Sequence, residues 1–300
     1  MQRINLSTSG PEFSRFVVGW WRLVAWKMSV SAVQRHIEAC LELGVTSHDH
    51  ADIYGDYTCE ALFGKALGAM TSVREKIEIV SKCGIQLVSA NRPQHKLKSY
   101  NTSSRHIIDS AEQSLKNLQT EYLDCLLIHR PDPLMNADEM AEAFDVLKNS
   151  GKVRHFGVSN FTPWQFDLLQ SRLDYPLVTN QVEISVLRLD AFLDGTLDQC
   201  QQDQIAPMAW SSLAGGRLFR DEDETAIRVK KRLQSIGHRL GASVDQVALA
   251  WLLFHPANIV PVVGSQSIER VKSALDSLAI QLTREDWYAI WEASSGCEVP

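Results

Sequence analysis

The sequence of 300 residues lacks the features that would direct it to a membrane or to nucleic acid. It contains no run of about 18 uncharged apolar residues, which is the length that a transmembrane helix needs. The N-terminal segment has neither a long apolar run nor a cleavage site of small residues, so we expect no signal peptide and a cytoplasmic location. Acidic residues outnumber basic ones by 36 to 30, and the net charge of −6 argues against nucleic-acid binding, which needs a basic face.

Paired cysteines are also absent. The six cysteines stand alone and far apart, without a CxxC motif or a histidine at metal-ligand spacing. We interpret them as small buried residues of a protein in a reducing compartment. His48 and His50 flank Asp49, but an HxH spacing without further ligands does not make a zinc site. We therefore expect neither disulfides nor a bound metal.

The dinucleotide-binding fingerprint GxGxxG is missing after the first apolar run, since residues 16–25 contain a single glycine. This argues against two doubly wound halves. Short apolar runs instead alternate with longer amphipathic stretches in about eight strand-then-helix units, which is typical of βαβ architecture. The apolar runs lack strict alternation, which favours a parallel sheet covered on both faces.

No Gly/Ser-rich linker divides the chain, and a single (β/α)8 barrel of about 250 residues fits its length. We predict an α/β fold in which residues 1–300 form one TIM barrel domain, with extra helices in the C-terminal half and a short N-terminal strand segment. The predicted strands are 3–6, 16–18, 45–49, 77–82, 125–128, 155–159, 177–183, 207–210 and 259–263. The predicted helices are 29–43, 59–67, 104–118, 137–149, 163–170, 191–202, 225–240, 244–254 and 267–277, with 244–254 as an extra helix outside the repeat.

Chemically capable side chains follow three successive predicted strands. In such a barrel the active site lies at the C-terminal ends of the strands. Asp49 ends one strand and Tyr54 follows it, Lys82 ends the next, and His129 follows the apolar run 125–128. A lysine and a histidine are costly at the ends of buried strands unless they are partnered. Taken singly, they also fit a structural salt bridge, a core histidine and a loop tyrosine, but their joint placement favours an active site.

Together these side chains suit the reduction of a carbonyl group. A tyrosine with a pKa of about 10 keeps its proton near neutral pH and can donate it. We expect Lys82 to lower the pKa of Tyr54, Asp49 to hold Lys82 charged, and His129 to donate to or orient the carbonyl oxygen. None of them supplies hydride, so a nicotinamide cofactor is implied.

The chain resembles the aldo-keto reductases over essentially its whole length. The segments that carry the resemblance are GVTSHDHADIYG at 44–55, SKCG at 81–84, LLIHRPD at 126–132, GVSNF at 157–161, NQVE at 180–183 and the final Gly264-Ser265 with Arg270-Val271. Within that family it is most similar to the bacterial YdhF-type oxidoreductases. The resemblance implies that Asp49, Tyr54, Lys82 and His129 are catalytic, and that the cofactor is NADP(H), with NAD(H) as the alternative.

The same resemblance implies a set of cofactor-binding residues. Ser159, Asn160 and Gln181 would bind the nicotinamide carboxamide, and Trp210 would stack under its ring, where the family usually has a tyrosine. Ser211, Leu213 and Gly215 would line the pyrophosphate, and Gly264, Ser265 and Arg270 would meet the adenosine 2′-phosphate. Gly19, Trp20, Trp21 and Arg217 complete the set, and the two tryptophans are also candidates for the wall of the substrate pocket. The family often has a lysine where Gly264 stands and Glu-Asn where Ser273-Ala274 stand, so we expect a weakened preference for NADPH.

Two functions remain open at this stage. The first is reduction of an aldehyde or ketone to the alcohol with NADPH, and the alternative is an NADPH-binding regulatory subunit with little turnover. We expect a small-molecule carbonyl substrate, no nucleic-acid or membrane partner, and a monomer or weak homodimer. Residues 86–103 are either disordered or a substrate loop over the barrel mouth. The shape of the pocket also depends on the loops at 20–26 and 217–224.

Overall fold

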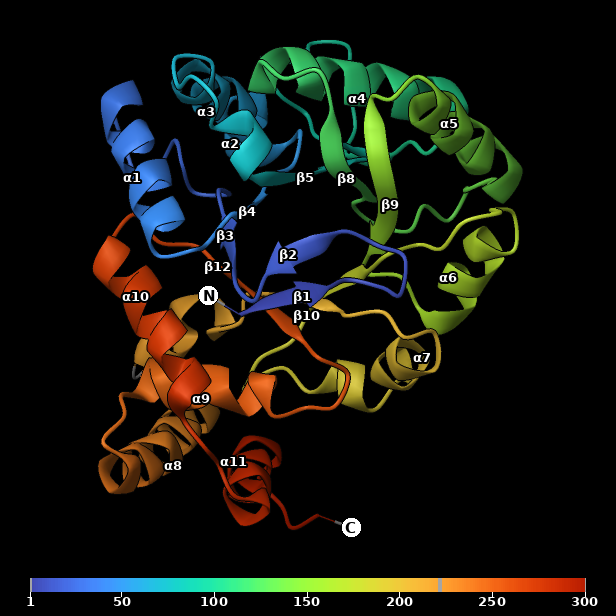
Figure 1. Ribbon diagram of the computed structural model, residues 1–300. Helices are drawn as coiled ribbons and strands as arrows, with labels where there is room; N and C mark the ends of the chain where they lie inside the picture. Colours follow the sequence, from blue (N-terminus) through green and yellow to red (C-terminus); the bar gives the residue numbers. More distant parts are fainter. Residues whose placement is uncertain (1, 221–222, 300) are drawn as a thin grey trace.

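The computed structural model describes residues 2–220 and 223–299. Eight parallel strands close into a barrel in the order β10-β11-β12-β3-β4-β5-β8-β9 (Figure 1). Their bounds are β3 (Val17–Gly19), β4 (Ser47–Asp49), β5 (Glu78–Cys83), β8 (Leu123–Ile128), β9 (Val153–Ser159), β10 (Asn180–Glu183), β11 (Met208–Trp210) and β12 (Val260–Val263). The predicted (β/α)8 barrel is confirmed.

Helices surround the barrel and bury their apolar faces against it. They are α1 (Val30–Glu42), α3 (Cys59–Leu67), α4 (Ser104–Leu118), α5 (Ala137–Asn149), α6 (Pro163–Gln170), α7 (Thr196–Gln202), α9 (Val244–Leu253) and α10 (Ile268–Asp276). Several begin at side chains that accept a hydrogen bond from the first turn, including Ser29, Ser103 and Thr162, the last in a capping box with Gln165.

An antiparallel hairpin of β1 (Arg3–Asn5) and β2 (Glu12–Ser14) lies across the N-terminal end of the barrel (Figure 1). Leu6 and Phe13 are fully buried and belong to the same apolar cluster as the barrel residues Val17, Leu127 and Met208. This hairpin forms a floor, so the barrel interior is a packed core and the opposite, C-terminal end is the mouth.

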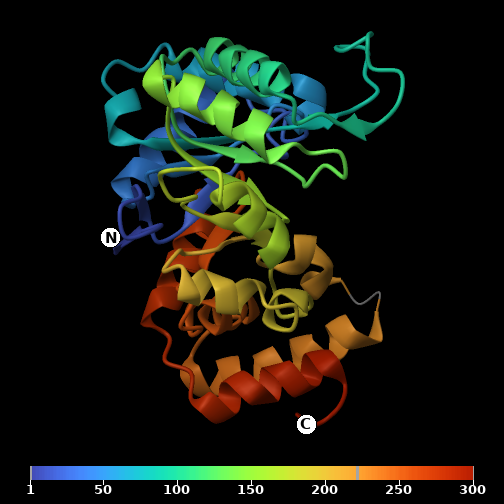
Figure 2. The same ribbon diagram turned by 90° about the vertical axis from the view of Figure 1, so that its right-hand side faces the viewer.

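Extra helices occur in the C-terminal half, as predicted, but the segment singled out as the extra helix is not one of them. The predicted extra helix at 244–254 is α9, which contacts β12 and α10 and is buried on all sides from Val247 to Leu252. The helices outside the repeat are α8 (Glu224–Leu240) and α11 (Arg284–Ser295), which lie along each other beyond α9 (Figure 2). The assignment of 244–254 was wrong because an evenly apolar helix is typical of a buried position; α11 was not predicted.

Other departures occur at turns. The helix predicted over 191–202 is broken into a short 3-10 turn, η2 (Asp190–Phe192), and α7, because Gly195 adopts a left-handed conformation with φ of 85°. The loop between β5 and α4 extends away from the barrel (Figure 2) and contains a small antiparallel pair, β6 (Ile85–Gln86) with β7 (Ser99–Tyr100). The remaining elements are α2 (Tyr54–Tyr57), η1 (Arg74–Lys76), η3 (Ala214–Phe219) and η4 (Ser277–Ala279). Residues 221 and 222 of the predicted polar segment 217–224 lie outside the described residues.

Candidate active site

The ends of three neighbouring strands bring four polar side chains together. The Lys82 Nζ atom on β5 donates to both carboxylate oxygens of Asp49 on β4, at 2.7 and 2.8 Å. The same Nζ lies 3.0 Å from the Tyr54 hydroxyl and 2.7 Å from the His50 carbonyl oxygen. The His129 ring, just after β8, stands edge-on to the Tyr54 ring with centroids 5.9 Å apart. The mouth thus holds one cluster made of the four residues that the sequence singled out.

Lys82 keeps its charge although its side chain is wholly inaccessible to solvent. Burial alone would lower its pKa, but the Asp49 carboxylate and the Tyr54 hydroxyl outweigh burial and raise it. An unpaired buried ammonium would lose its proton, so Asp49 is what keeps this cation in place. The expectation that Asp49 holds Lys82 charged agrees with this geometry.

Lys82 lowers the pKa of Tyr54, as expected, but burial has the larger effect. Burial raises the pKa of the Tyr54 phenol to about 12, and the Asp49 carboxylate adds to the rise, while Lys82 acts in the opposite direction. The sequence argument counted the cation and not the desolvation. Tyr54 is therefore fully protonated at neutral pH, and Lys82 limits the rise in its pKa without reversing it.

His129 is neutral in this environment. Burial lowers the pKa of its imidazole well below the usual value, and the positive charges of Lys82 and Arg130 lower it further. Its Nδ1 atom is buried and has no hydrogen-bond partner among the described residues. A neutral imidazole donates through one ring nitrogen only, so His129 is suited to donating one hydrogen bond to a ligand oxygen rather than to carrying charge.

The next three strands end in a second, connected polar cluster. Ser159 and Gln181 stand in register on β9 and β10, and the Ser159 hydroxyl donates to the Gln181 carbonyl at 2.7 Å. The Gln181 side-chain amide donates to Asp49 at 2.8 Å, which links this cluster to the ion pair. Asn160 donates to the His129 carbonyl at 3.2 Å and accepts from the Trp210 indole at 3.0 Å. The structure brings together the four residues expected around a nicotinamide.

The loop after β11 has a backbone suited to an anion. Ser211, Ala214, Gly215 and Gly216 all have positive φ angles, between 53° and 92°. Successive turns of this kind direct backbone N–H groups into a shared concavity that attracts phosphate. The neighbouring Leu213 lies just before η3, whereas Arg217 at its end pairs with Asp223 at 2.9 Å. Arg217 is thus engaged with the protein, and within the loop the Ala214 and Gly216 N–H groups donate to the Ser211 and Leu213 carbonyl oxygens.

A second anion-compatible segment follows β12. Gly264 lies against β3, where an added Cβ would stand 3.3 Å from the Gly19 carbonyl oxygen. Ser265 accepts from the Ser267 backbone, and Ser267 caps α10. Arg270, in the first turn of α10, is exposed. A helix N-terminus with hydroxyl groups and a cation beside it is chemically matched to a phosphate.

The two tryptophans after β3 have different environments. Trp21 is 58% exposed at the rim of the mouth. Trp20 is fully buried, stacks on His50, and donates from its indole to His48 at 3.0 Å. Trp20 also contacts Phe63 of α3, with ring centroids 4.9 Å apart, so its side chain lies between barrel and helix. The expectation that Trp20 lines the substrate pocket was wrong, because adjacent residues leaving a strand point to opposite sides.

Sequence reasoning missed two features of the mouth. Arg130, next to His129, places its guanidinium carbon 5.6 Å from the centre of the Trp210 ring. Tyr57, buried three residues after Tyr54, fastens the loop at 86–103: its hydroxyl accepts from Leu87 N at 2.8 Å and its ring lies 4.4 Å from the Arg92 guanidinium carbon. These contacts favour the substrate-loop interpretation of that segment over disorder. The only sequence signal for Arg130 is its place beside His129 in the HRPD motif, where the sequence argument concerned the histidine alone.

Metal-binding clusters and membrane-spanning helices are both absent from the described residues. Across residues 2–220 and 223–299, no group of three or more His, Cys, Asp or Glu side chains is arranged to hold a metal ion. Within the same residues, no helix is both long and apolar enough to cross a membrane. Five of the cysteines are buried, whereas Cys297 is exposed and departs from the expected burial.

Comparison with known proteins gives matches that span the chain. Residues 15–295 match the model of the aldo/keto reductase family. Over the full length of both chains, the protein is 54% identical to oxidoreductase YdhF of Escherichia coli (strain K12) and 46% identical to 6-dehydroglucose reductase of Agrobacterium fabrum. Among solved structures, the thermostable aldo-keto reductase Tm1743 in complex with the inhibitor epalrestat matches with a TM-score of 0.80 and 27% identity, covering 98% of this chain and all of that one.

Proposed function

This chain belongs to the aldo/keto reductase family and is an oxidoreductase of carbonyl compounds, and we propose that it reduces an aldehyde or ketone to the alcohol with NADPH, using Tyr54 as the proton donor. The observation that carries the proposal is the contact of the Tyr54 hydroxyl with a buried, charged Lys82, at 3.0 Å. A phenol beside a fixed ammonium can release its proton only when a stronger acceptor, such as a developing alkoxide, forms next to it.

The residues at the mouth divide the work of proton transfer. When bound, the nicotinamide supplies the hydride. Tyr54 gives its proton to the carbonyl oxygen, and Lys82 stabilises the phenolate that remains. Asp49 keeps Lys82 charged and in place, and it is itself held by Gln181 at 2.8 Å. His129, neutral and next to Tyr54, donates a hydrogen bond that orients the carbonyl oxygen.

The residues present fit a nicotinamide dinucleotide. We assign Ser159, Asn160, Gln181 and Trp210 to the nicotinamide, because their side chains already form one connected cluster beside Asp49. The left-handed turn at 211–216 suits the pyrophosphate, and the α10 N-terminus with Ser265 and Arg270 suits the 2′-phosphate. Gly19, Gly264 and Trp21 border this region. We also assign Arg217 to the cofactor site, which it can reach only when its ion pair with Asp223 breaks.

The alternative, a nucleotide-sensing subunit with little turnover, is less favoured. A binding subunit has no need of a charged lysine held against a tyrosine in the core, since the desolvation of Lys82 is costly. We further propose a cytosolic protein with one domain over residues 1–300, which is a monomer or weak homodimer.

The experiment that separates the two functions is a turnover assay. NADPH consumption is followed by absorbance with a panel of aldehydes, ketones and quinones, and with NADH in parallel. The panel includes 6-dehydroglucose, because two relatives that are 46% and 36% identical are named for its reduction. Turnover of at least one carbonyl compound supports the enzyme; tight NADPH binding without any turnover supports the sensing subunit.

A further inference from the structure

Arg130 stands at the mouth with its guanidinium directed toward the site. It follows His129 at the C-terminal end of β8 and is partly buried. Its guanidinium carbon lies 5.6 Å from the centre of the Trp210 ring on β11, so the side chain reaches across the ends of the intervening strands. A cation over an indole face is attracted by the ring, which restrains the arginine in this position.

The contacts of Trp210 tie Arg130 to the reacting cluster. The Trp210 indole donates to the Asn160 side chain at 3.0 Å, and Asn160 donates in turn to the His129 carbonyl at 3.2 Å. Arg130 is bonded through the chain to the same His129. These links connect Arg130 through Trp210 and Asn160 to the backbone of His129 at the mouth.

The guanidinium of Arg130 has no hydrogen-bond or ion-pair partner among the described residues. Three acidic groups at or after the strand ends have partners of their own: Asp49 is engaged by Lys82 and Gln181, Glu183 by Arg188 at 3.8 Å, and Asp132 by Leu134 N at 2.8 Å. A guanidinium offers five N–H donors in a planar fork, and partial burial makes it costly to leave these donors without hydrogen-bond acceptors. A bound ligand could therefore supply the acceptor that the protein does not offer to the Arg130 guanidinium.

The charge of Arg130 shapes the field at the mouth. After burial itself, Lys82 and Arg130 are the groups that depress the pKa of His129, so both cations act on the reacting cluster. Because Asp49 balances Lys82, the guanidinium of Arg130 is a positive charge without an ion-pair partner among the described residues, in a protein whose net charge is −6. Such a field favours ligands rich in oxygen acceptors, above all anionic ones, and disfavours cations.

We propose that Arg130 is a specificity-determining residue, which selects carbonyl compounds bearing an oxygen acceptor, a carboxylate or a hydroxyl, over apolar aldehydes of the same length. The inference rests on the proposed reductase function. It gives the substrate class as short, oxygen-rich aldehydes or ketones, with the acceptor bound by the guanidinium fork while the carbonyl oxygen meets Tyr54 and His129.

The test uses two matched pairs of aldehydes with the intact protein and NADPH. Succinate semialdehyde against butyraldehyde isolates a carboxylate, and glyceraldehyde against propionaldehyde isolates hydroxyl groups. We expect the wild type to favour the oxygenated member of each pair in kcat/KM. Arg130→Met should lower kcat/KM for succinate semialdehyde by about 10- to 100-fold and for glyceraldehyde by about 2- to 10-fold, the scales of charged and neutral hydrogen bonds.

Three controls make the outcome specific. Arg130→Lys keeps the charge without the fork, so it should restore part of the carboxylate preference and little of the hydroxyl preference. Arg105→Met removes an exposed arginine on α4, whose side chain is 92% accessible, and should change nothing. Arg22→Met tests a contact to the proposed pyrophosphate loop, because Arg22 donates to the Gly215 carbonyl at 3.4 Å. Its loss should weaken NADPH binding and leave the preference among aldehydes unchanged.

The failures are distinguishable. If the wild type reduces neither the four aldehydes nor any compound of the wider carbonyl panel, the proposed reductase function is contradicted. If it reduces other carbonyl compounds but none of the four, the reductase function stands and the proposed substrate class is wrong. If it reduces the four aldehydes without preferring the oxygenated members, or if Arg130→Met slows both members of each pair equally, Arg130 is not a specificity residue while the reductase function stands. A weakened NADPH affinity in Arg130→Met with unchanged preference would assign the guanidinium to a cofactor phosphate instead, and would also overturn the proposal.

Discussion

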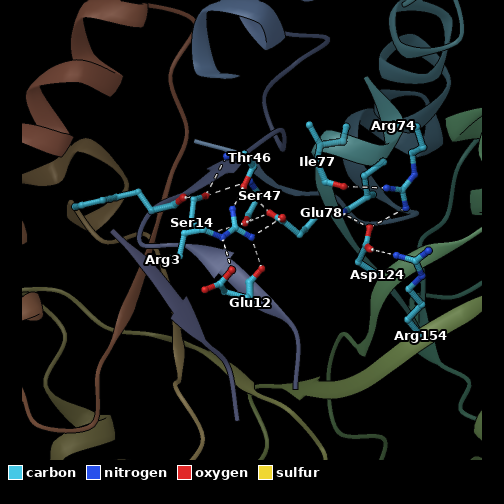
Figure 3. Close-up of polar contacts among 12 residues, drawn as sticks. Arg3, Glu12, Ser14, Thr46, Ser47, Arg74, Ile77, Glu78, Asp124 and Arg154 are labelled. Carbon is cyan, nitrogen blue, oxygen red and sulfur yellow. Dashed lines mark hydrogen bonds and ion pairs between the residues drawn. The ribbon is translucent and has the colours of Figure 1, made fainter. Parts of the chain in front are cut away.

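The floor and the mouth of the barrel both carry networks of charged side chains, but the two differ in whether the protein itself supplies every partner. At the floor, Arg3 pairs with Glu12 at 2.7 Å and with Glu78 at 2.8 Å, and Thr46 and Ser47 donate to the second oxygen of Glu78 (Figure 3). Some buried side-chain atoms of the described residues lack a hydrogen-bond partner, but none of them belongs to a charged side chain of this network. The charged groups of this floor network are paired within the protein itself.

At the mouth, several buried polar atoms have no partner among the described residues, including His129 Nδ1, Asp52 Oδ1 and both ring nitrogens of His50. The pKa values of Tyr54 and His129 are displaced in opposite directions, which leaves both groups neutral beside a charged lysine. A saturated network stabilises a fold, whereas an incomplete one with shifted pKa values is typical of a functional site. The contrast indicates which buried charges serve stability and which serve chemistry.

The largest expected effect is on the floor. Asp124 accepts from Arg74 at 2.7 Å, from Ile79 N at 2.9 Å and from Arg154 at 3.2 Å (Figure 3). Asp124→Ala leaves these donors without their acceptor. It should lower the free energy of unfolding by about 3 kcal/mol, as for a broken buried pair. Urea denaturation measures this, and turnover of the folded fraction should be unchanged.

The matched control for Asp124 is a surface pair. Glu112 contacts Lys152 at 2.5 Å, with both side chains 39% accessible. Glu112→Ala should lower the free energy of unfolding far less than Asp124→Ala does, as is usual for exposed pairs. Equal costs for the two substitutions would contradict the view that the floor network stabilises the barrel.

At the mouth, Lys82→Met should act mainly on chemistry. Without the cation, the Tyr54 phenolate loses its stabilising partner, and turnover should fall by about 100-fold. Asp49 is then buried without a counter-charge, so the double variant Asp49→Asn with Lys82→Met serves as the control that removes the uncompensated charge, while the Gln181 amide can still donate to the side-chain oxygen at position 49. It should recover stability and not activity. Full activity of the single variant between about pH 6 and 9 would show that Lys82 is only structural.

A smaller effect is expected where the mouth meets the cofactor's phosphate end. NADPH should bind more tightly than NADH, and Arg270→Ala should narrow the gap by about 10-fold, chiefly by weakening NADPH. The missing lysine at Gly264 limits the preference. A titration of tryptophan fluorescence with each cofactor measures both affinities. Equal affinities in the wild type, or an unchanged ratio in the variant, would remove Arg270 from the site.

The smallest expected effect concerns a histidine just behind the mouth. Burial lowers the pKa of His50 well below its usual value of 6.5, and His48 and Lys82 lower it further. As pH falls below about 6.5 the unfolded chain takes up a proton at this position and the native protein does not, so stability is lost on acidification. His50→Phe should therefore reduce the loss of unfolding free energy between about pH 7.5 and 5.5 by about 1 kcal/mol.

The same substitution provides its own check at neutral pH. Both ring nitrogens of His50 are buried without a partner among the described residues, so the apolar ring of His50→Phe should be neutral or slightly stabilising there. His36→Phe is a useful comparison, because burial also lowers the pKa of His36 and its Nε2 lacks a partner within the described chain. An unchanged acid dependence in His50→Phe would mean that this histidine is protonated in the native state.

The sequence predicts most where the signals are local. The bounds of α3 and α6 agree with prediction because hydrophobic periodicity and caps such as Thr162 define them. It fails where neighbours decide: whether Trp20 or Trp21 faces the mouth depends on the twist of the strand end, and the pKa of Tyr54 depends on burial. Arg130 carried no periodic signal, and its lack of a partner becomes visible only when the strand ends are assembled. Tertiary packing, which no local pattern encodes, settles all three.

The most direct test of the central claim is the turnover of Tyr54→Phe. The substitution removes only the hydroxyl that lies 3.0 Å from Lys82 and leaves the ring beside His129. We expect carbonyl reduction to fall by about 100-fold or more, with NADPH affinity and unfolding free energy close to those of the wild type. Near-wild-type reduction of a simple aldehyde by this variant would contradict the assignment of Tyr54 as the proton donor.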